Sequence, residues 1–226
     1  MNYLSRKNRP DILFAVHQCA NYIIDPKQSH EEAVKIIEQY LKKKDDKGLV
    51  FTPNVSIRIE CYANAYFVGS WLREDLDQVG SVFSRTGYII KFSHCPIVWV
   101  SKIQTEIALS TTEAEYISLS QIMRDFIPLR QIILEVSIVF GMKCDLCNSY
   151  TTTFEENNGA IELAKEPKYR HRTKNLSIKL YHFREHIKQV TSKTVYIKTN
   201  EQEAGNMTKP LAKPQFEYLR KHIVGW

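Results

Sequence analysis

One acidic residue, Glu115, heads an apolar stripe within the stretch ALSTTEAEYISL and the residues that follow it. Glu115, Leu119, Ile122 and Phe126 are spaced i, i+4, i+7 and i+11, which places them on one face of a helix. A carboxylate in such a stripe is costly unless a positive group, such as a metal ion, lies against it. The spacing therefore makes Glu115 a candidate metal ligand at the entry to a helix.

The start of this helix has two interpretations. Ser110 with Glu113 fits a capping box, in which the serine oxygen accepts a backbone N–H and the glutamate reaches back to another. Thr112 with Glu115 has the same spacing, and in that arrangement Glu115 completes a cap and binds no metal. Spacing alone favours neither.

The composition limits the class of protein. The chain has 226 residues, 43% of them hydrophobic, which suffices for one medium domain with or without a helical appendage. A net charge of +6 suits a polyanionic partner. No apolar run reaches membrane-span length and no signal-peptide core opens the chain, so we expect no membrane contact and an intracellular location, cytoplasmic or nuclear. Five cysteines, an odd number, favour free thiols.

Hydrophobic periodicity divides the chain into an ordered set of elements. The expected helices are 9–24, 29–44, one from 110, 128–140, 159–165, 176–190 and 214–223. The expected strands are 55–64, 82–92, 97–102, 150–154 and 194–198. Three meander strands, a crossover helix and later strands beside the first describe an α/β fold with a mixed sheet flanked by helices. This order matches the ribonuclease H layout, preceded by an N-terminal helical segment.

Short motifs run through the chain in a fixed order. They include Arg9-Pro10-Asp11-Ile12, Ser84-Arg85-Thr86-Gly87-Tyr88, Ala108-Leu109-Ser110, Thr112-Glu113-Ala114-Glu115-Tyr116, Arg172-Thr173-Lys174, Tyr181-His182-Phe183 and Thr208-Lys209-Pro210-Leu211. In order and spacing, these motifs closely resemble the C-terminal part of the Pol polyprotein of copia-type LTR retrotransposons. The resemblance implies a thumb or connection remnant of the reverse transcriptase at 1–50, a ribonuclease H-like domain at 51–212 and a C-terminal helix at 213–226.

The resemblance also implies a chemistry. Members of this family cleave the RNA strand of RNA–DNA hybrids with two divalent ions, Mg²⁺ or Mn²⁺, held by four carboxylates. Two ions about 3.5–4 Å apart clamp the attacking and leaving oxygens of an in-line displacement. Hard cations take oxygen ligands, and several negative charges are needed to hold two of them close together.

Four positions match the family's metal carboxylates, and two of them are no longer acidic. The helix glutamate is Glu115, and the carboxylate after the next strand is Glu156, in EENNGAI. Asn64, in YANAYFVG, replaces the aspartate of the first strand, and Gly205 replaces the aspartate before Thr-Lys-Pro-Leu. The resemblance therefore implies that Glu115 and Glu156 are the remaining metal ligands and that Asn64 and Gly205 are degenerate catalytic positions.

These losses lead us to expect a catalytically inactive pseudoenzyme with weak or no metal binding and residual affinity for RNA–DNA hybrid or other nucleic acid. The alternatives are an active metal-dependent hybrid ribonuclease with an altered ligand set and a structural subunit without nucleic-acid affinity. Lys168, Arg170, Arg172 and Lys174 form a basic stretch that we expect to contact backbone phosphates, with a solvated loop as the alternative.

Overall fold

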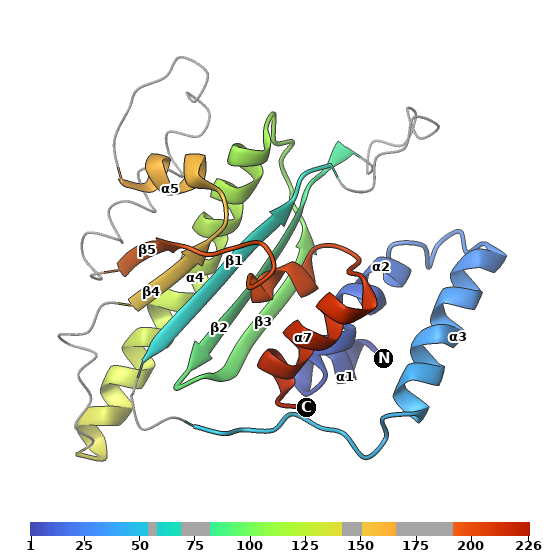
Figure 1. Cartoon of the computed structure of the whole chain (residues 1–226), viewed down its shortest axis with the longest axis horizontal. Helices are drawn as coiled ribbons and strands as arrows, with labels where there is room; N and C mark the ends of the chain where they lie inside the picture. The colour runs from blue at the N-terminus through green and yellow to red at the C-terminus, as the bar shows by residue number, and fades with distance from the viewer. Residues whose placement is uncertain (54–57, 69–81, 142–150, 166–191) are drawn as a thin grey trace.

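A five-stranded mixed sheet forms the centre of the computed structural model, which describes residues 1–53, 58–68, 82–141, 151–165 and 192–226. The strands are β1 (Ile59–Tyr66), β2 (Arg85–Phe92), β3 (Cys95–Ile103), β4 (Thr151–Glu155) and β5 (Ser192–Tyr196), in the order β3-β2-β1-β4-β5. The first three pair antiparallel, and β4 and β5 run parallel to β1. The predicted α/β class and the predicted mixed sheet, with a three-strand meander and later strands beside the first, are confirmed (Figure 1).

Helices cover both faces of the sheet (Figure 1). The helical elements are α1 (Asn2–Lys7), η1 (Pro10–Ile12), α2 (Leu13–Ala20), α3 (Gln28–Lys42), α4 (Thr111–Val139), α5 (Asn158–Lys165), η5 (Glu203–Met207) and α7 (Lys213–Val224). Because successive strand residues alternate between faces, Cys61 and Ala63 pack in the core beneath α4, whereas Tyr62 packs with Met207 and Leu219 of η5 and α7.

The long helix α4 corrects one prediction. We expected a separate helix to begin at Pro128, but α4 continues through this proline from Thr111 to Val139. Proline removes one backbone hydrogen bond, and packing offsets that loss. Phe126 before the proline is fully buried, and Ile133 after it packs against the same core, so the apolar stripe is continuous across the proline. Among the described residues, no helix combines the length and apolar character needed to cross a bilayer.

Other predicted elements begin or end at different residues, or lie in parts of the chain that the structure does not describe. The turn expected at 93–96 consists of Ser93 and His94 alone, both with positive φ (49° and 68°), and β3 begins at Cys95. Two consecutive residues of positive φ are characteristic of a type I′ hairpin, whose twist matches that of the strands. The predicted helix 176–190 and the two thiols of Cys144 and Cys147 lie outside the described residues.

A buried guanidinium joins α2 to the sheet. Arg85 on β2 is 4% exposed, and its NH2 atom donates to Gln18 Oε1 at 2.6 Å. Its NH1 atom lies 2.9 Å from His17 Nδ1 and 3.2 Å from Ser101 Oγ. These partners are uncharged, so the contact depends on His17 remaining neutral. Burial, followed by the charge of Arg85, lowers the pKa of His17 to about 4.

A second contact joins the two ends of the described chain. The indole Nε1 of Trp226 donates to the Gly48 carbonyl at 2.8 Å. Three cations lie over its ring, with Arg220 Cζ at 4.4 Å, Arg9 Cζ at 5.4 Å and Lys44 Nζ at 5.6 Å from the ring centroid. Cation–π attraction and burial therefore hold the N-terminal helices against the end of α7.

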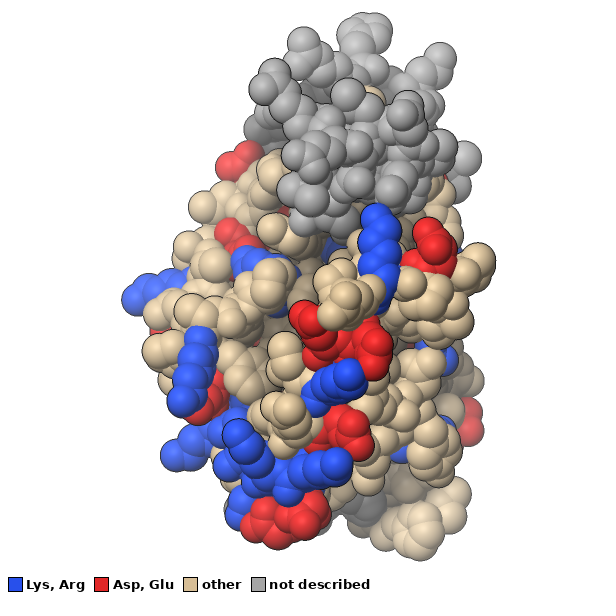
Figure 2. Space-filling view, turned by 90° about the vertical axis from the view of Figure 1, so that its right-hand side faces the viewer, with Lys and Arg blue, Asp and Glu red and all other residues tan. Residues whose placement is uncertain are grey.

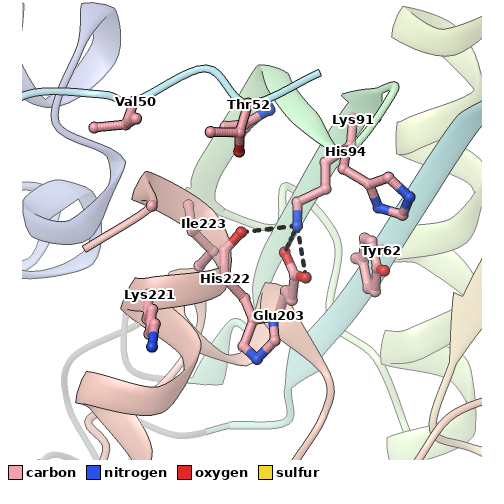
Figure 3. A pocket seen from close by; sticks show the side chains of 11 residues that line it. Val50, Thr52, Tyr62, Lys91, His94, Glu203, Lys221, His222 and Ile223 are labelled. Carbon is pink, nitrogen blue, oxygen red and sulfur yellow. Dashed lines mark hydrogen bonds and ion pairs between the residues drawn. The ribbon is translucent and has the colours of Figure 1, made fainter. Parts of the chain in front are cut away.

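A buried ion pair ties the sheet to the C-terminal elements beside a pocket of about 300 Å³ (Figure 3). Lys91 Nζ on β2 lies 2.6 Å from both carboxylate oxygens of Glu203 and donates to the His222 carbonyl at 3.0 Å. The ammonium group therefore contacts η5 and the end of α7 at once. Removing either charge would leave the other buried and unpaired.

The contact between His17 and Arg85 generates a prediction about acid stability. Between about pH 6.5 and pH 4, the unfolded chain binds a proton that folded His17 resists, so the free energy of unfolding falls as the pH falls through this range. The variant His17→Gln keeps an acceptor for Arg85 and should lose this part of the pH dependence. Urea denaturation at several pH values measures the effect. An unchanged slope between pH 6.5 and pH 4 would contradict it.

Candidate functional site

The four sequence-predicted site residues lie together at the end of β1 and β4. Glu115 Oε2 accepts a hydrogen bond from the backbone N–H of Ala65, the residue after Asn64, at 2.6 Å. A Cβ atom added at Gly205 would lie 3.6 Å from Asn64 Nδ2. Glu156 joins this group through Lys209, whose Nζ lies 3.8 Å from Glu156 Oε1 and whose Cε lies 3.8 Å from the place of a Cβ at Gly205. The topology thus brings these four positions to one end of the sheet.

The entry to α4 separates the two interpretations of Glu115. Ser110 is the N-cap, with its Oγ accepting the Glu113 backbone N–H at 3.1 Å. Glu113 reaches back to the Leu109 N–H at 2.9 Å. Glu115 is 5% exposed and bonds to β1, so it takes no part in the cap. Its carboxylate therefore lies among the site residues and not in the helix cap.

Asn64 belongs to a closed hydrogen-bond network. The Thr208 hydroxyl donates to the Gly205 carbonyl at 3.2 Å, so its oxygen accepts from Asn64 Nδ2 at 2.9 Å. This assignment points the amide nitrogen at Thr208 and Gly205 and leaves the buried Oδ1 without a hydrogen-bond partner among the described residues. The N–H donor of this amide therefore faces the Gly205 position.

Gly87 determines how close η5 lies to the sheet. It pairs with Asn64 across β1 and β2. A Cβ atom at Gly87 would come within 2.5 Å of Thr208 Cγ2 and 2.7 Å of Met207 Cβ, closer than real contacts allow. The missing side chain lets η5 and Thr208 rest directly on β2, which places Gly205 beside Asn64.

Sequence reasoning missed a second glutamate, Glu155, at the end of β4. It is fully buried, its Oε1 accepts the Asn157 backbone N–H at 2.9 Å, and its Oε2 has no hydrogen-bond partner among the described residues. The signal was available, because Thr151 and Thr153 are buried in alternation and Glu155 continues the same face. The strand was expected to end one residue earlier, which hid this alternation.

The carboxylates influence one another. Burial raises the pKa of Glu155 to about 8. Burial also raises the pKa of Glu115 well above its usual range, and the charges of Glu155 and Glu156 raise it further. The Ala65 N–H and the charge of Lys209 act in the opposite direction. These raised pKa values favour the protonated, neutral forms of Glu115 and Glu155, so ionising either carboxyl requires a positive neighbour.

Lys209 is the positive side chain at this point. Its Nζ lies 3.8 Å from Glu156 Oε1, and its Cε lies 3.8 Å from the place of a Cβ at Gly205. Lys209 belongs to the Thr208-Lys209-Pro210-Leu211 motif, but sequence reasoning gave it no role in the site. Its side chain therefore passes the Gly205 position and ends beside the Glu156 carboxylate.

The residues present do not fit a pair of divalent ions. Within the described ranges, no three side chains of His, Cys, Asp or Glu are arranged to hold a metal ion. Asn64 presents an N–H donor toward the position of Gly205, and a donor repels a cation. Mg²⁺ requires near-octahedral oxygen ligands, and two ions require more carboxylates than this arrangement offers.

The predicted nucleic-acid contacts Lys168, Arg170, Arg172 and Lys174 lie outside the described residues. Figure 2 shows the molecule from the side on which α3 lies in Figure 1. On that face, the described lysines and arginines are interspersed with aspartates and glutamates. That part of the surface therefore offers no field of a single sign to a polyanion.

Comparison with known proteins gives the family. No family model matches the chain. The retrovirus-related Pol polyprotein from transposon TNT 1-94 of Nicotiana tabacum is 34% identical over 217 residues, covering 96% of this chain and 15% of that protein. The one from transposon RE2 of Arabidopsis thaliana is 26% identical over 215 residues, covering 95% and 14%. This chain belongs to the copia-type retrotransposon Pol polyprotein family.

The chain spans about one seventh of the length of these Pol polyproteins. It is also similar to the secreted RxLR effector protein 161 of Plasmopara viticola, at 34% identity over 119 residues, covering 53% of this chain and 78% of that protein. Among solved structures, the metagenomic LC11-RNase H1 from compost matches with a TM-score of 0.46 at 13% identity, covering 67% of this chain and 92% of that one.

The close approach at Gly87 generates a prediction about stability. Gly87→Ala should lower the free energy of unfolding by about 1–3 kcal/mol, because the added methyl group displaces Thr208 and Met207 from the sheet. Gly48→Ala is the matched control, since a Cβ there meets nothing within 4 Å. Denaturant unfolding of both variants measures the difference. Equal stability of the two variants would show that η5 does not depend on this glycine.

Proposed function

We propose that this Pol-derived chain is a ribonuclease H-like domain that has lost hydrolysis of the RNA strand of RNA–DNA hybrids and retains nucleic-acid binding. The family and the α/β fold support this hydrolysis as the ancestral reaction, with which the present site is compared. The state of the site supports the loss, because a fold carries an activity only where its site is intact.

One observation carries this proposal. At the two positions that lack their family carboxylate, Asn64 and Gly205 face each other, and the Asn64 amide is committed to Thr208. Glu115 and Glu156 remain as the matching acids, and Lys209 lies 3.8 Å from Glu156. Two acids beside an ammonium group supply too little negative charge for two divalent ions about 3.5–4 Å apart.

A second candidate function has one observation in its favour. Glu155 adds a buried carboxylate whose Oε2 has no hydrogen-bond partner in the described part of the chain. The charges of Glu155 and Glu156 both act on Glu115. No three of these side chains are arranged to hold a metal ion within the described ranges, so an active ribonuclease would use them as an altered ligand set only after they rearrange around the ion. Activity measurements in both Mg²⁺ and Mn²⁺ separate this candidate from the inactive domain.

Residual nucleic-acid binding is supported by charge. The net charge of +6 and the basic stretch Lys168–Lys174 suit contacts with backbone phosphates, which need no metal ion. Release of counterions from the nucleic acid then drives binding, and the affinity falls as salt rises.

Hybrid cleavage tests the loss of activity. The unmodified chain should not cleave an RNA–DNA hybrid in Mg²⁺ or Mn²⁺, and the double variant Asn64→Asp/Gly205→Asp should gain metal-dependent cleavage. An aspartate fits at position 205, because its Cβ would make only ordinary contacts at 3.6 and 3.8 Å. The control is Asn21→Asp/Gly48→Asp, with the same changes at an exposed residue and an open glycine.

Two results would contradict this proposal. Cleavage by the unmodified chain that Glu115→Gln abolishes would establish an active site with an altered ligand set. If a folded Asn64→Asp/Gly205→Asp variant gained no hybrid cleavage, positions 64 and 205 would not be metal-ligand positions. Circular dichroism of each variant provides the check on folding.

Salt dependence tests the binding. Hybrid affinity should fall steeply between low and physiological salt, and replacing Lys168, Arg170, Arg172 and Lys174 by alanine should reduce the slope of log K against log salt by up to about 3.6, which is about 0.9 for each lost phosphate contact. The control replaces four exposed lysines, Lys35, Lys42, Lys198 and Lys213, by alanine. An affinity indifferent to salt, or an equal change in the control, would contradict binding through the basic stretch.

A further inference from the structure

The pairing of β1 with β4 stops just before the site. Tyr62 and Phe154 form the last parallel pair, and the ladder between these two strands ends there. β4 stays paired with β5 for one residue more, through Glu155. The strands β1 and β4 therefore separate at Asn64 and Glu155, and a group outside the ladder is needed to hold their ends at a fixed spacing.

Gln202 supplies that group. It is fully buried between β5 and η5, and its Nε2 donates to the Ala63 carbonyl at 2.9 Å and to the Phe154 carbonyl at 3.3 Å. One amide nitrogen carries two hydrogens, so it can serve a carbonyl of each strand at once. The reverse orientation would place Oε1 against two carbonyl oxygens, so the surrounding groups fix which way the amide points.

The two carbonyls belong to the peptide units next to the site residues. The Ala63 carbonyl shares a planar peptide unit with the N–H of Asn64, and the Phe154 carbonyl shares one with the N–H of Glu155. Holding these carbonyls therefore fixes the backbone from which both side chains leave. Glutamine suits this place, because asparagine is one methylene shorter and an ionised glutamate would present only acceptors to the two carbonyls.

Gln202 also holds η5. Its Oε1 accepts the Ala204 N–H at 3.4 Å, and its own backbone carbonyl accepts the Gly205 N–H at 3.0 Å. The same residue thus caps the short helix that carries Gly205 and bonds to both strands. Three segments that contribute site positions therefore meet at one buried side chain.

We propose that Gln202 is a positioning residue of this site. Its amide sets the spacing between the ends of β1, β4 and η5, and with it the relative places of Asn64, Glu155 and Gly205. Site groups are placed accurately only where supporting hydrogen bonds hold the elements that carry them. The role concerns the backbone and not the charge of the carboxylates, so it does not depend on whether the chain cleaves RNA–DNA hybrid.

Amide hydrogen exchange, followed by nuclear magnetic resonance, tests this role. Gln202→Met keeps the length of the side chain and removes the donor. The N–H groups of Ala65 and Asn157 bond to carboxylates at the two strand ends. In the variant they should exchange about tenfold faster or more, relative to the N–H of the fully buried Ile89 on β2. A variant that is only less stable would speed all three amides alike, because global unfolding exposes each of them.

Gln215→Met is the matched control. Its amide also donates to a backbone carbonyl, that of Asn200 at 2.6 Å, but outside the site. This variant should leave the ratio of the exchange rates unchanged. Equal acceleration of all three amides in Gln202→Met, or no acceleration, would overturn the positioning role. Neither result bears on hybrid cleavage, which the chain can lose or keep independently.

If Gln202→Met does not fold, Gln202→Glu decides. A protonated carboxyl still donates one hydrogen, whereas an ionised one does not, and burial favours the protonated form in mild acid. The amides of Ala65 and Asn157 should therefore be protected at pH 5.5 and should lose protection at pH 8, alone or with the whole fold. A glutamate variant that is equally protected at both pH values, or unfolded at both, contradicts the role.

Discussion

A buried carboxylate loses its hydration, and the ends of β1 and β4 must compensate two of them, Glu115 and Glu155. Each accepts one hydrogen bond from a backbone N–H: Glu115 from Ala65, and Glu155 from Asn157. These bonds fix the first turns of α4 against β1 and the turn from β4 into α5. The carboxylates therefore position the elements around them, whether or not they perform chemistry.

Asn64 and Gly205, the two positions at which we propose that an acid has been lost, are neighbours, and this makes their joint replacement physically reasonable. Asn64 Nδ2 lies 3.6 Å from the place of a Cβ at Gly205, so two aspartates there would repel each other strongly unless a cation separated them. Losing both removes that repulsion and with it the need for the cation. The Asn64–Thr208–Gly205 network then satisfies the amide nitrogen and Thr208 with hydrogen bonds between uncharged groups.

Local patterns predicted much of this architecture. The period-two strands and the apolar stripe behind Glu115 follow from neighbouring residues, and the ordered motifs supplied the four site positions. Pro128 misled the prediction because long-range packing of the apolar stripe outweighs one missing hydrogen bond. Lys209 lies beside Glu156, which is far from it in sequence, and periodicity does not report such a contact. Glu155 was missed because β4 was expected to end one residue earlier.

The ring of Trp226 contacts residues that lie far from it in the sequence and are therefore synthesised much earlier. Its hydrogen bond to Gly48 spans 178 residues, and Arg9 and Lys44 lie over the same ring. At 5–20 residues per second, the helices of residues 1–47 wait roughly 10–40 s for this partner to be synthesised. During that interval those helices are joined by the cluster of Ile12, Val16 and Ile37 and by the hydrogen bond from the Tyr40 hydroxyl to Asp11 Oδ2. The contacts between Trp226 and the N-terminal segment therefore form only after the strands of the sheet have been synthesised, although that segment is translated before them.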